Sequence, residues 1–172
     1  MTVLLGSNTP TSGGNLGPGS GQAISRGSQA ALASGVVASL NSYLNSLGTG
    51  ATTIYMALTD ASFNVLCQGS VAAQVGLNTI PIVGGPSLVL GTQYWLWQQV
   101  NGTVSSGYVT DGSGGFHVQH LANSTLPFTN PFGSGNTNTA GGILSAWADD
   151  GGGGGGGGGG APPLGMLLGM GI

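Results

Sequence analysis

The chain of 172 residues carries one Arg, no Lys, no Glu and four Asp, so charged residues make up 3% of it and the formal net charge is −3. A typical soluble domain is about a quarter charged, and binding to nucleic-acid phosphates requires several Lys or Arg side chains, so a nucleic-acid partner is excluded. The length suits one domain, and Cys67, the single cysteine, allows no internal disulfide.

An uncharged surface indicates a protein that acts within an assembly. Its contacts with water must come from Ser, Thr, Asn and Gln side chains and from the backbone, because so few charged side chains exist. Such a surface lacks charge repulsion between copies and loses little when it packs against a copy or a neighbour. Adaptation to strong acid or to salt-free surroundings is the alternative.

The N-terminal segment, residues 1–22, is dense in Gly, Ser, Thr, Asn and Pro, which predicts an extended arm. Val3, Leu4 and Leu5 would pin its start either onto the body or onto a neighbouring subunit. The segment has neither the basic region nor the apolar run of a signal peptide, and the chain has no stretch of the roughly 18 apolar residues that a membrane helix needs. We therefore expect synthesis in a cytoplasm and no membrane span.

From residue 23 to 148, short segments alternate with the period of two that half-buried strands require. In residues 36–47 one face holds Val36, Ala38, Leu40 and Leu44, and the other holds Val37, Asn41, Tyr43 and Asn45. In residues 52–60 the inward side chains are Ile54, Met56 and Leu58. In residues 91–100 one face holds Tyr94, Leu96, Gln98 and Val100, and the other holds Trp95, Trp97 and Gln99. Residues 63–72, 76–84 and 141–149 predict further strands.

Turn signals separate these segments. Residues 60–64 and 111–115 fit hairpin connections, and residues 107–122 predict two strands around a Gly-rich turn. A helix over residues 27–44 is the alternative at that place, but Gly35 interrupts it and the β-branched Val36 and Val37 follow, so a strand is favoured. The pattern predicts an all-β fold, a single antiparallel sandwich of roughly seven to nine strands.

Two runs, residues 34–70 and residues 76–100, resemble a known kind of module. They are similar to the jelly-roll modules of bacteriophage virion proteins and related bacterial surface proteins, in which a WNTFPL strand precedes an SLTAGTYWL strand. The sequence LNTIPI at residues 77–82 matches the first motif, with Leu77 in place of the usual Trp, and LVLGTQYW at residues 88–95 matches the second. The resemblance spans about residues 23–148 and implies a jelly-roll body. Such modules occur in capsid decoration, tail and carbohydrate-binding proteins alike.

Two tryptophans form the first candidate site. Trp95 and Trp97 share one strand face, and two indoles on an outer sheet face are typical of a platform on which a sugar stacks; Tyr108 is a candidate third member. The alternatives are that these rings belong to the core or that a neighbouring subunit covers them, because aromatic residues are also enriched at interfaces.

Other reactive residues predict structural roles. His117 and His120, three apart on a strand, point to opposite faces and cannot chelate one metal. Asp60 and Asp111 stand in turns, where aspartate accepts backbone hydrogen bonds, and Cys67 is expected to be a small buried residue on a strand. We expect neither an enzyme nor a cofactor. The sequons at Asn101 and Asn123 are chance matches.

The C-terminal segment, residues 149–172, holds Asp149 and Asp150, ten glycines from Gly151 to Gly160, and an apolar end. The aspartates are expected to solvate the junction. Ordering ten glycines costs on the order of 10 to 20 kcal/mol of backbone entropy, so the run is a flexible tether unless other chains hold it. The predicted anchor stiffens its exit with Pro162 and Pro163 and buries Leu164, Met166, Leu167, Leu168, Met170 and Ile172 in a partner. A linker without a role is the alternative.

Together these features predict a non-enzymatic structural virion protein of a phage. It would decorate the capsid as a cement protein or form part of the tail, contact other virion proteins, and assemble as a homotrimer or another homo-oligomer. A carbohydrate-binding adhesin module that recognises a glycan is the alternative, and an extracellular filament subunit is a third possibility.

Overall fold

The computed structural model describes residues 1–10, 15–16, 23–102, 107–109, 118–121, 126–130, 136–138 and 144–152. In this part of the chain the regular structure is all β, as predicted, and no helix is long and apolar enough to span a membrane. The strands are β1 (Val3–Gly6), β2 (Asn15–Leu16), β3 (Ala23–Ala30), β4 (Gly35–Val36), β5 (Ser39–Ser46), β6 (Thr53–Thr59), β7 (Val65–Ala72), β8 (Gly76–Pro81), β9 (Ser87–Leu88), β10 (Gln93–Val100), β11 (Gly107–Val109), β12 (Val118–Leu121), β13 (Asn136–Asn138) and β14 (Ala146–Asp149).

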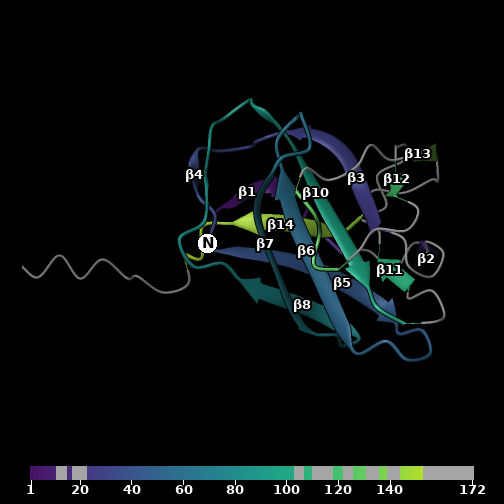
Figure 1. Ribbon diagram of the computed structural model, residues 1–172. Helices are drawn as coiled ribbons and strands as arrows, with labels where there is room; N and C mark the ends of the chain where they lie inside the picture. Colours follow the sequence, from purple (N-terminus) through teal and green to yellow (C-terminus); the bar gives the residue numbers. More distant parts are fainter. Residues whose placement is uncertain are drawn as a thin grey trace, which may run out of the picture.

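Two antiparallel sheets make up the body (Figure 1). Sheet A has the order β1-β14-β5-β11-β2, and β8 pairs with β5 in addition. Sheet B has the order β13-β12-β3-β10-β6-β7. A separate two-stranded ladder joins β4 to β9. This arrangement confirms an all-β fold built as a sandwich.

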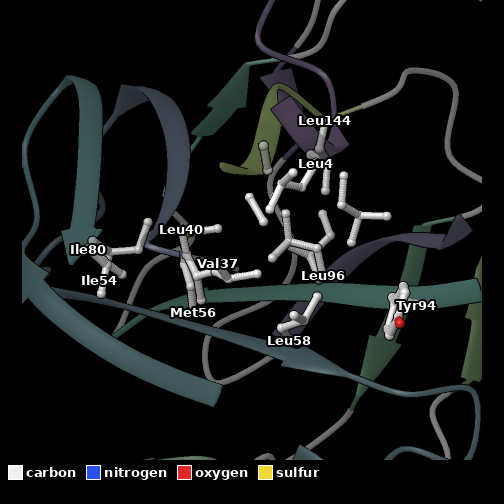
Figure 2. Packing of buried hydrophobic residues seen from close by; sticks show 14 of the residues in the cluster. Leu4, Val37, Leu40, Ile54, Met56, Leu58, Ile80, Tyr94, Leu96 and Leu144 are labelled. Atoms are coloured by element: carbon white, nitrogen blue, oxygen red, sulfur yellow. The ribbon is translucent and has the colours of Figure 1, made fainter. Parts of the chain in front are cut away.

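The main core fills the space between the two sheets (Figure 2). Ile54, Met56 and Leu58 on β6 are fully buried there, as the period of two predicts. Across from them, sheet A supplies Leu40, Leu44, Ile80, Ala146 and Ala148. Full burial of one such aliphatic side chain stabilises the fold by about 1.5–3 kcal/mol, so this cluster holds the sheets together.

The predicted faces of residues 36–47 are wrong at their start. Val37 is fully buried in the core, whereas Val36 is exposed. The reason is that β4 and β5 are not one strand: Val36 pairs with Ser87 on β9, and the N–H of Val37 donates to the carbonyl of Pro86. The alternation therefore restarts before Leu40, which is buried as predicted.

The start of the chain is part of the body rather than an arm. Strand β1 pairs with β14 along the edge of sheet A, and a bulge between Val3 and Leu5 lets both Leu4 and Leu5 enter the core (Figure 1). Of the two expectations for these leucines, packing onto the body is the one observed. The sandwich thus includes residues 3–6, well ahead of the predicted boundary at residue 22.

Residues 107–122 do not form the predicted hairpin. Strand β11 pairs with β5 and β2 in sheet A, whereas β12 pairs with β3 and β13 in sheet B. The two strands therefore belong to different sheets. The predicted turn at residues 60–64 does connect β6 to β7 as a hairpin.

Candidate functional site

The predicted tryptophan pair is the centre of a second cluster, which lies on the outer face of sheet B. Alternate residues of a strand share a face, and the rings of Trp95 and Trp97 are stacked with centroids 5.6 Å apart and an interplanar angle of 15°. Phe63 lies 5.3 Å from Trp95 and 6.1 Å from Trp97. Phe128 and Tyr55 complete this aromatic cluster.

Trp97 belongs to the core of this cluster. Its side chain is fully buried, and its Nε1 donates to Thr59 Oγ1 at 3.2 Å. A ring that is enclosed in this way presents no face to a sugar, so the core alternative is the one observed for Trp97. Trp95 is half-buried and keeps part of its surface accessible.

Tyr108 does not join the two tryptophans. It lies on β11 in sheet A, where it pairs with Leu16 and Leu44, whereas Trp95 and Trp97 lie on β10 in sheet B. The strand pairing therefore places Tyr108 in a different sheet from the two tryptophans.

The segment 126–130 lies against the outer face of sheet B at the aromatic cluster. Gln68 Nε2 on β7 donates to the carbonyl of Phe128 at 3.1 Å, and Asn130 Oδ1 accepts from the N–H of Val65 at 3.1 Å. Beside it is an open hollow of about 330 Å³ lined by Tyr55, Gln68, Gly69, Ser70 and Pro127. Sequence analysis missed this segment because a single Phe between prolines shows no strand period.

Asp149 has a very different role from the predicted one. It is fully buried, and its carboxylate accepts four hydrogen bonds. Oδ1 accepts from Ser39 Oγ at 2.7 Å and from the N–H of Gly151 at 3.0 Å. Oδ2 accepts from Asn41 Nδ2 at 2.9 Å and from Trp147 Nε1 at 3.1 Å. A buried charge requires such compensation, so Asp149 fixes the place where the chain leaves sheet A.

Asp150 ties the two ends of the described chain together. Its Oδ1 accepts from the N–H of Thr2 at 2.7 Å and from the N–H of Gly152 at 3.0 Å. These bonds, with that to Thr2 the strongest influence, lower the pKa of Asp150 to about 2. The ammonium group of Met1 donates to the carbonyl of Gly152 at 2.7 Å. The start of the C-terminal segment is thereby held beside the N-terminus.

Five exposed apolar side chains stand on loops that backbone and side-chain hydrogen bonds link to this junction. The residues concerned, here called the apolar end, are Leu32, Val36, Val83, Val89 and Leu90. Their loops are tied together, because Leu90 N–H donates to Ser34 Oγ and Ile82 N–H donates to the carbonyl of Ala38. Ala38 in turn donates its N–H to the carbonyl of Asp149 and packs against Gly151. The apolar end and the chain exit therefore lie together.

The remaining candidates have structural surroundings. Asp60 caps its turn by accepting from the N–H groups of Ser62 and Asn64, and the Asn64 side chain lowers the pKa of Asp60 below its ordinary value. Cys67 packs partly buried against the core, and burial raises the pKa of its thiol to about 11. The described residues contain no group of three metal-ligating side chains.

Several predicted residues lie outside the described part. His117, Asp111 and the anchor residues Gly160, Pro162, Pro163, Leu164, Leu167, Leu168 and Ile172 are among them, while Gly151 is described. No family model, curated protein or solved structure matches the chain. The resemblance to phage jelly-roll modules therefore stays a prediction.

Proposed function

We propose that the chain is a non-enzymatic structural virion protein of a phage, which decorates the capsid or forms part of the tail and is held to its neighbours through its ends. The single observation that carries this proposal is the apolar end beside the chain exit. Exposed apolar residues there lie beside Gly152, from which the chain continues into the C-terminal segment.

The energetics favour a covered apolar end. Val83 is completely exposed and Leu32, Val36, Val89 and Leu90 are each more than half exposed. Burying a Val or Leu side chain stabilises a complex by about 1.5–3 kcal/mol, so a neighbour that covers these side chains would stabilise the assembly. With one Arg and four Asp in 172 residues, charge repulsion between neighbouring copies is small.

The fixed exit supports a role for the C-terminal segment as an anchor. Asp149 and Asp150 hold Gly151 and Gly152 in place, so the glycine run begins from a rigid point on the body. The apolar residues from Leu164 to Ile172 then reach a neighbouring subunit or shell protein without any movement of the sandwich.

The test compares incorporation into virus particles for three variants. Deletion of residues 153–172 and the double substitution Val83→Asp/Leu90→Asp should each reduce the copy number per particle at least tenfold. Ala61→Asp/Ser62→Asp, on the exposed turn between β6 and β7, is the matched control and should leave it unchanged. Full incorporation of both test variants would refute the proposal.

The adhesin alternative has one observation in its favour. Trp95 is half-buried, and the hollow at the other end of the aromatic cluster is lined by the Tyr55 ring, the Gln68 amide and the Ser70 hydroxyl group. Saturable glycan binding that is lost in Trp95→Ala with the fold intact would support the adhesin. Trp97→Ala is unsuitable for this test because Trp97 is a core residue.

A further inference from the structure

Strand β7 is the outermost strand at one edge of sheet B. It pairs with β6 from Ala72 to Val65, and among the described residues no strand pairs with its other side (Figure 1). The strand is eight residues long, VLCQGSVA, and contains neither a charged residue nor a proline. Every second backbone N–H and C=O of an antiparallel edge strand faces away from its neighbour and is free to bond another chain.

Proteins ordinarily protect such an edge. Lysines, prolines, bulges or very short strands at an edge prevent pairing with another molecule. Other edge strands described here show these devices: β1 is four residues long and bulged, and β8 ends in Pro81. Strand β7 has no lysine and no proline and is not short, and its six residues from Cys67 to Ala72 pair regularly with β6. Its one irregularity is at its start, where Leu66 has no partner on β6 and the N–H of Val65 donates to Asn130 Oδ1.

The sequence of β7 is complementary to itself in one register. In an antiparallel pair of two β7 strands with the twofold axis through Gly69, Leu66 lies opposite Ala72 and Gln68 lies opposite Ser70 on the outer face. Cys67 lies opposite Val71 on the inner face. Apolar residues therefore meet apolar ones, and polar residues meet polar ones.

Neighbouring registers lack this match. A shift by one position along the chain would place inward residues opposite outward ones, which the pleat forbids. An axis through Gln68 places Leu66 opposite Ser70, and an axis through Ser70 places Gln68 opposite Ala72. The register centred on Gly69 is thus the favoured one.

A hollow at the rim of the sandwich lies where Leu66 of the second copy would pack. A hollow of about 540 Å³ adjoins the end of β7 and is lined by Val71, Ala72, Gln74, Leu77, Asn78 and Thr79. In the register centred on Gly69, Leu66 of the second copy lies opposite Ala72 and therefore beside this hollow. Leu66 and Leu77 are each more than a third exposed, and the pairing would cover both.

We propose that a second copy of this chain pairs with β7 in this antiparallel register, so that two sheets B become one continuous sheet across a twofold axis. The inference deepens the proposed assembly role and rests on that role for its biological meaning. It also makes the homo-oligomer twofold rather than threefold.

The test uses disulfide cross-linking in a Cys67→Ala background, which removes the native thiol. Gln68→Cys and Ser70→Cys are made as separate full-length proteins, and each alone and their mixture are oxidised. Directly opposed residues lie about 4.5–5.5 Å apart at Cβ, whereas diagonal ones lie about 7–8 Å apart, beyond the usual disulfide range. The mixture should give at least five times more covalent dimer than either protein alone. A mixture that gives no more dimer than the single proteins would overturn the inference.

Sedimentation of the uncross-linked protein provides the second readout. Gln68→Lys/Ser70→Lys places lysine opposite lysine at both polar pairs and should convert the dimer to monomer. Ala61→Lys/Ser62→Lys adds the same charge at an exposed turn and should leave the dimer intact. Wild-type protein that sediments as a monomer throughout a concentration series would also refute the pairing. Incorporation into particles is measured with different variants, so the two tests can fail separately. A monomeric protein would refute the pairing and leave the proposed function standing, and unchanged incorporation would refute the proposed function and leave the pairing standing.

Discussion

Asp149→Asn replaces the buried carboxylate by an amide of the same shape. Each carboxylate oxygen accepts two hydrogen bonds, so whichever position the amide nitrogen takes, two donors face an N–H₂ group instead of an acceptor. Hydrogen bonds to a charged group contribute about 1.5–3 kcal/mol each. The substitution should therefore lower the free energy of unfolding by about 3–6 kcal/mol, a large fraction of the 5–15 kcal/mol typical of a domain.

The assay is equilibrium urea unfolding followed by tryptophan fluorescence, because Trp147 donates directly to Asp149. Asp150→Asn is the matched control: the same change one residue later, on an exposed carboxylate, should have a much smaller effect. An unchanged or higher free energy of unfolding for Asp149→Asn would refute the reasoning. It would mean that the cost of burying the charge exceeds the gain from its four hydrogen bonds.

Four further predictions follow from individual contacts. Ser39→Ala should destabilise the protein by about 1.5–3 kcal/mol, because Ser39 donates to a carboxylate. Ser42→Ala should stabilise it by up to about 1 kcal/mol, because Ser42 Oγ is buried without a partner among the described residues. Urea midpoints measure both changes, and a shift of the two midpoints in the same direction would contradict this prediction. Asn101→Ala should cost about 1–3 kcal/mol, because Asn101 Oδ1 accepts from the N–H groups of Thr52, just before β6, and of Thr53, its first residue. Asn101→Asp keeps a carboxylate oxygen as acceptor and should cost less. The pKa of Asp150 lies near 2 when folded and about 3.9 when unfolded, so its contribution is present above pH 4 and lost as the pH falls through 2; the urea midpoint of the wild type should exceed that of Asp150→Asn at pH 6, and the difference should shrink at pH 2. A difference that stays constant between the two pH values would refute it. Because the pKa of the Cys67 thiol is about 11, Cys67 should react with a thiol reagent at pH 8 far more slowly in the native protein than in the unfolded protein. The rate in the native protein should rise as the pH approaches 11. Equal rates in the native and unfolded proteins at pH 8 would contradict the burial of the thiol.

Local alternation predicted much of the core, because a strand with one buried face must repeat every two residues. Ile54, Met56 and Leu58 follow this rule and are buried. The rule failed at Val36 and Val37, where the chain changes partner from β9 to the strands of sheet A. Alternation records the face of a residue within one strand and carries no information on where one pairing ends and the next begins.

The candidate site shows the same division between local and distant information. That Trp95 and Trp97 share a face follows from their spacing, but the burial of Trp97 depends on Phe128, some thirty residues away in the chain. The role of Asp149 depends on Ser39 and Asn41, more than a hundred residues earlier. An aspartate before ten glycines resembles a solvated junction in the sequence, and only the pairing of β14 with β5 brings it to its donors.

The central proposal, that this sparsely charged sandwich acts as a structural part of a phage particle, is tested most directly by counting the protein in purified virions. Quantitative mass spectrometry of such particles should find peptides of this chain at a fixed copy number relative to the main shell protein. Hundreds of copies would indicate capsid decoration, and a handful would indicate a tail component. Particles that are complete and infectious without any peptide of this chain would contradict the account.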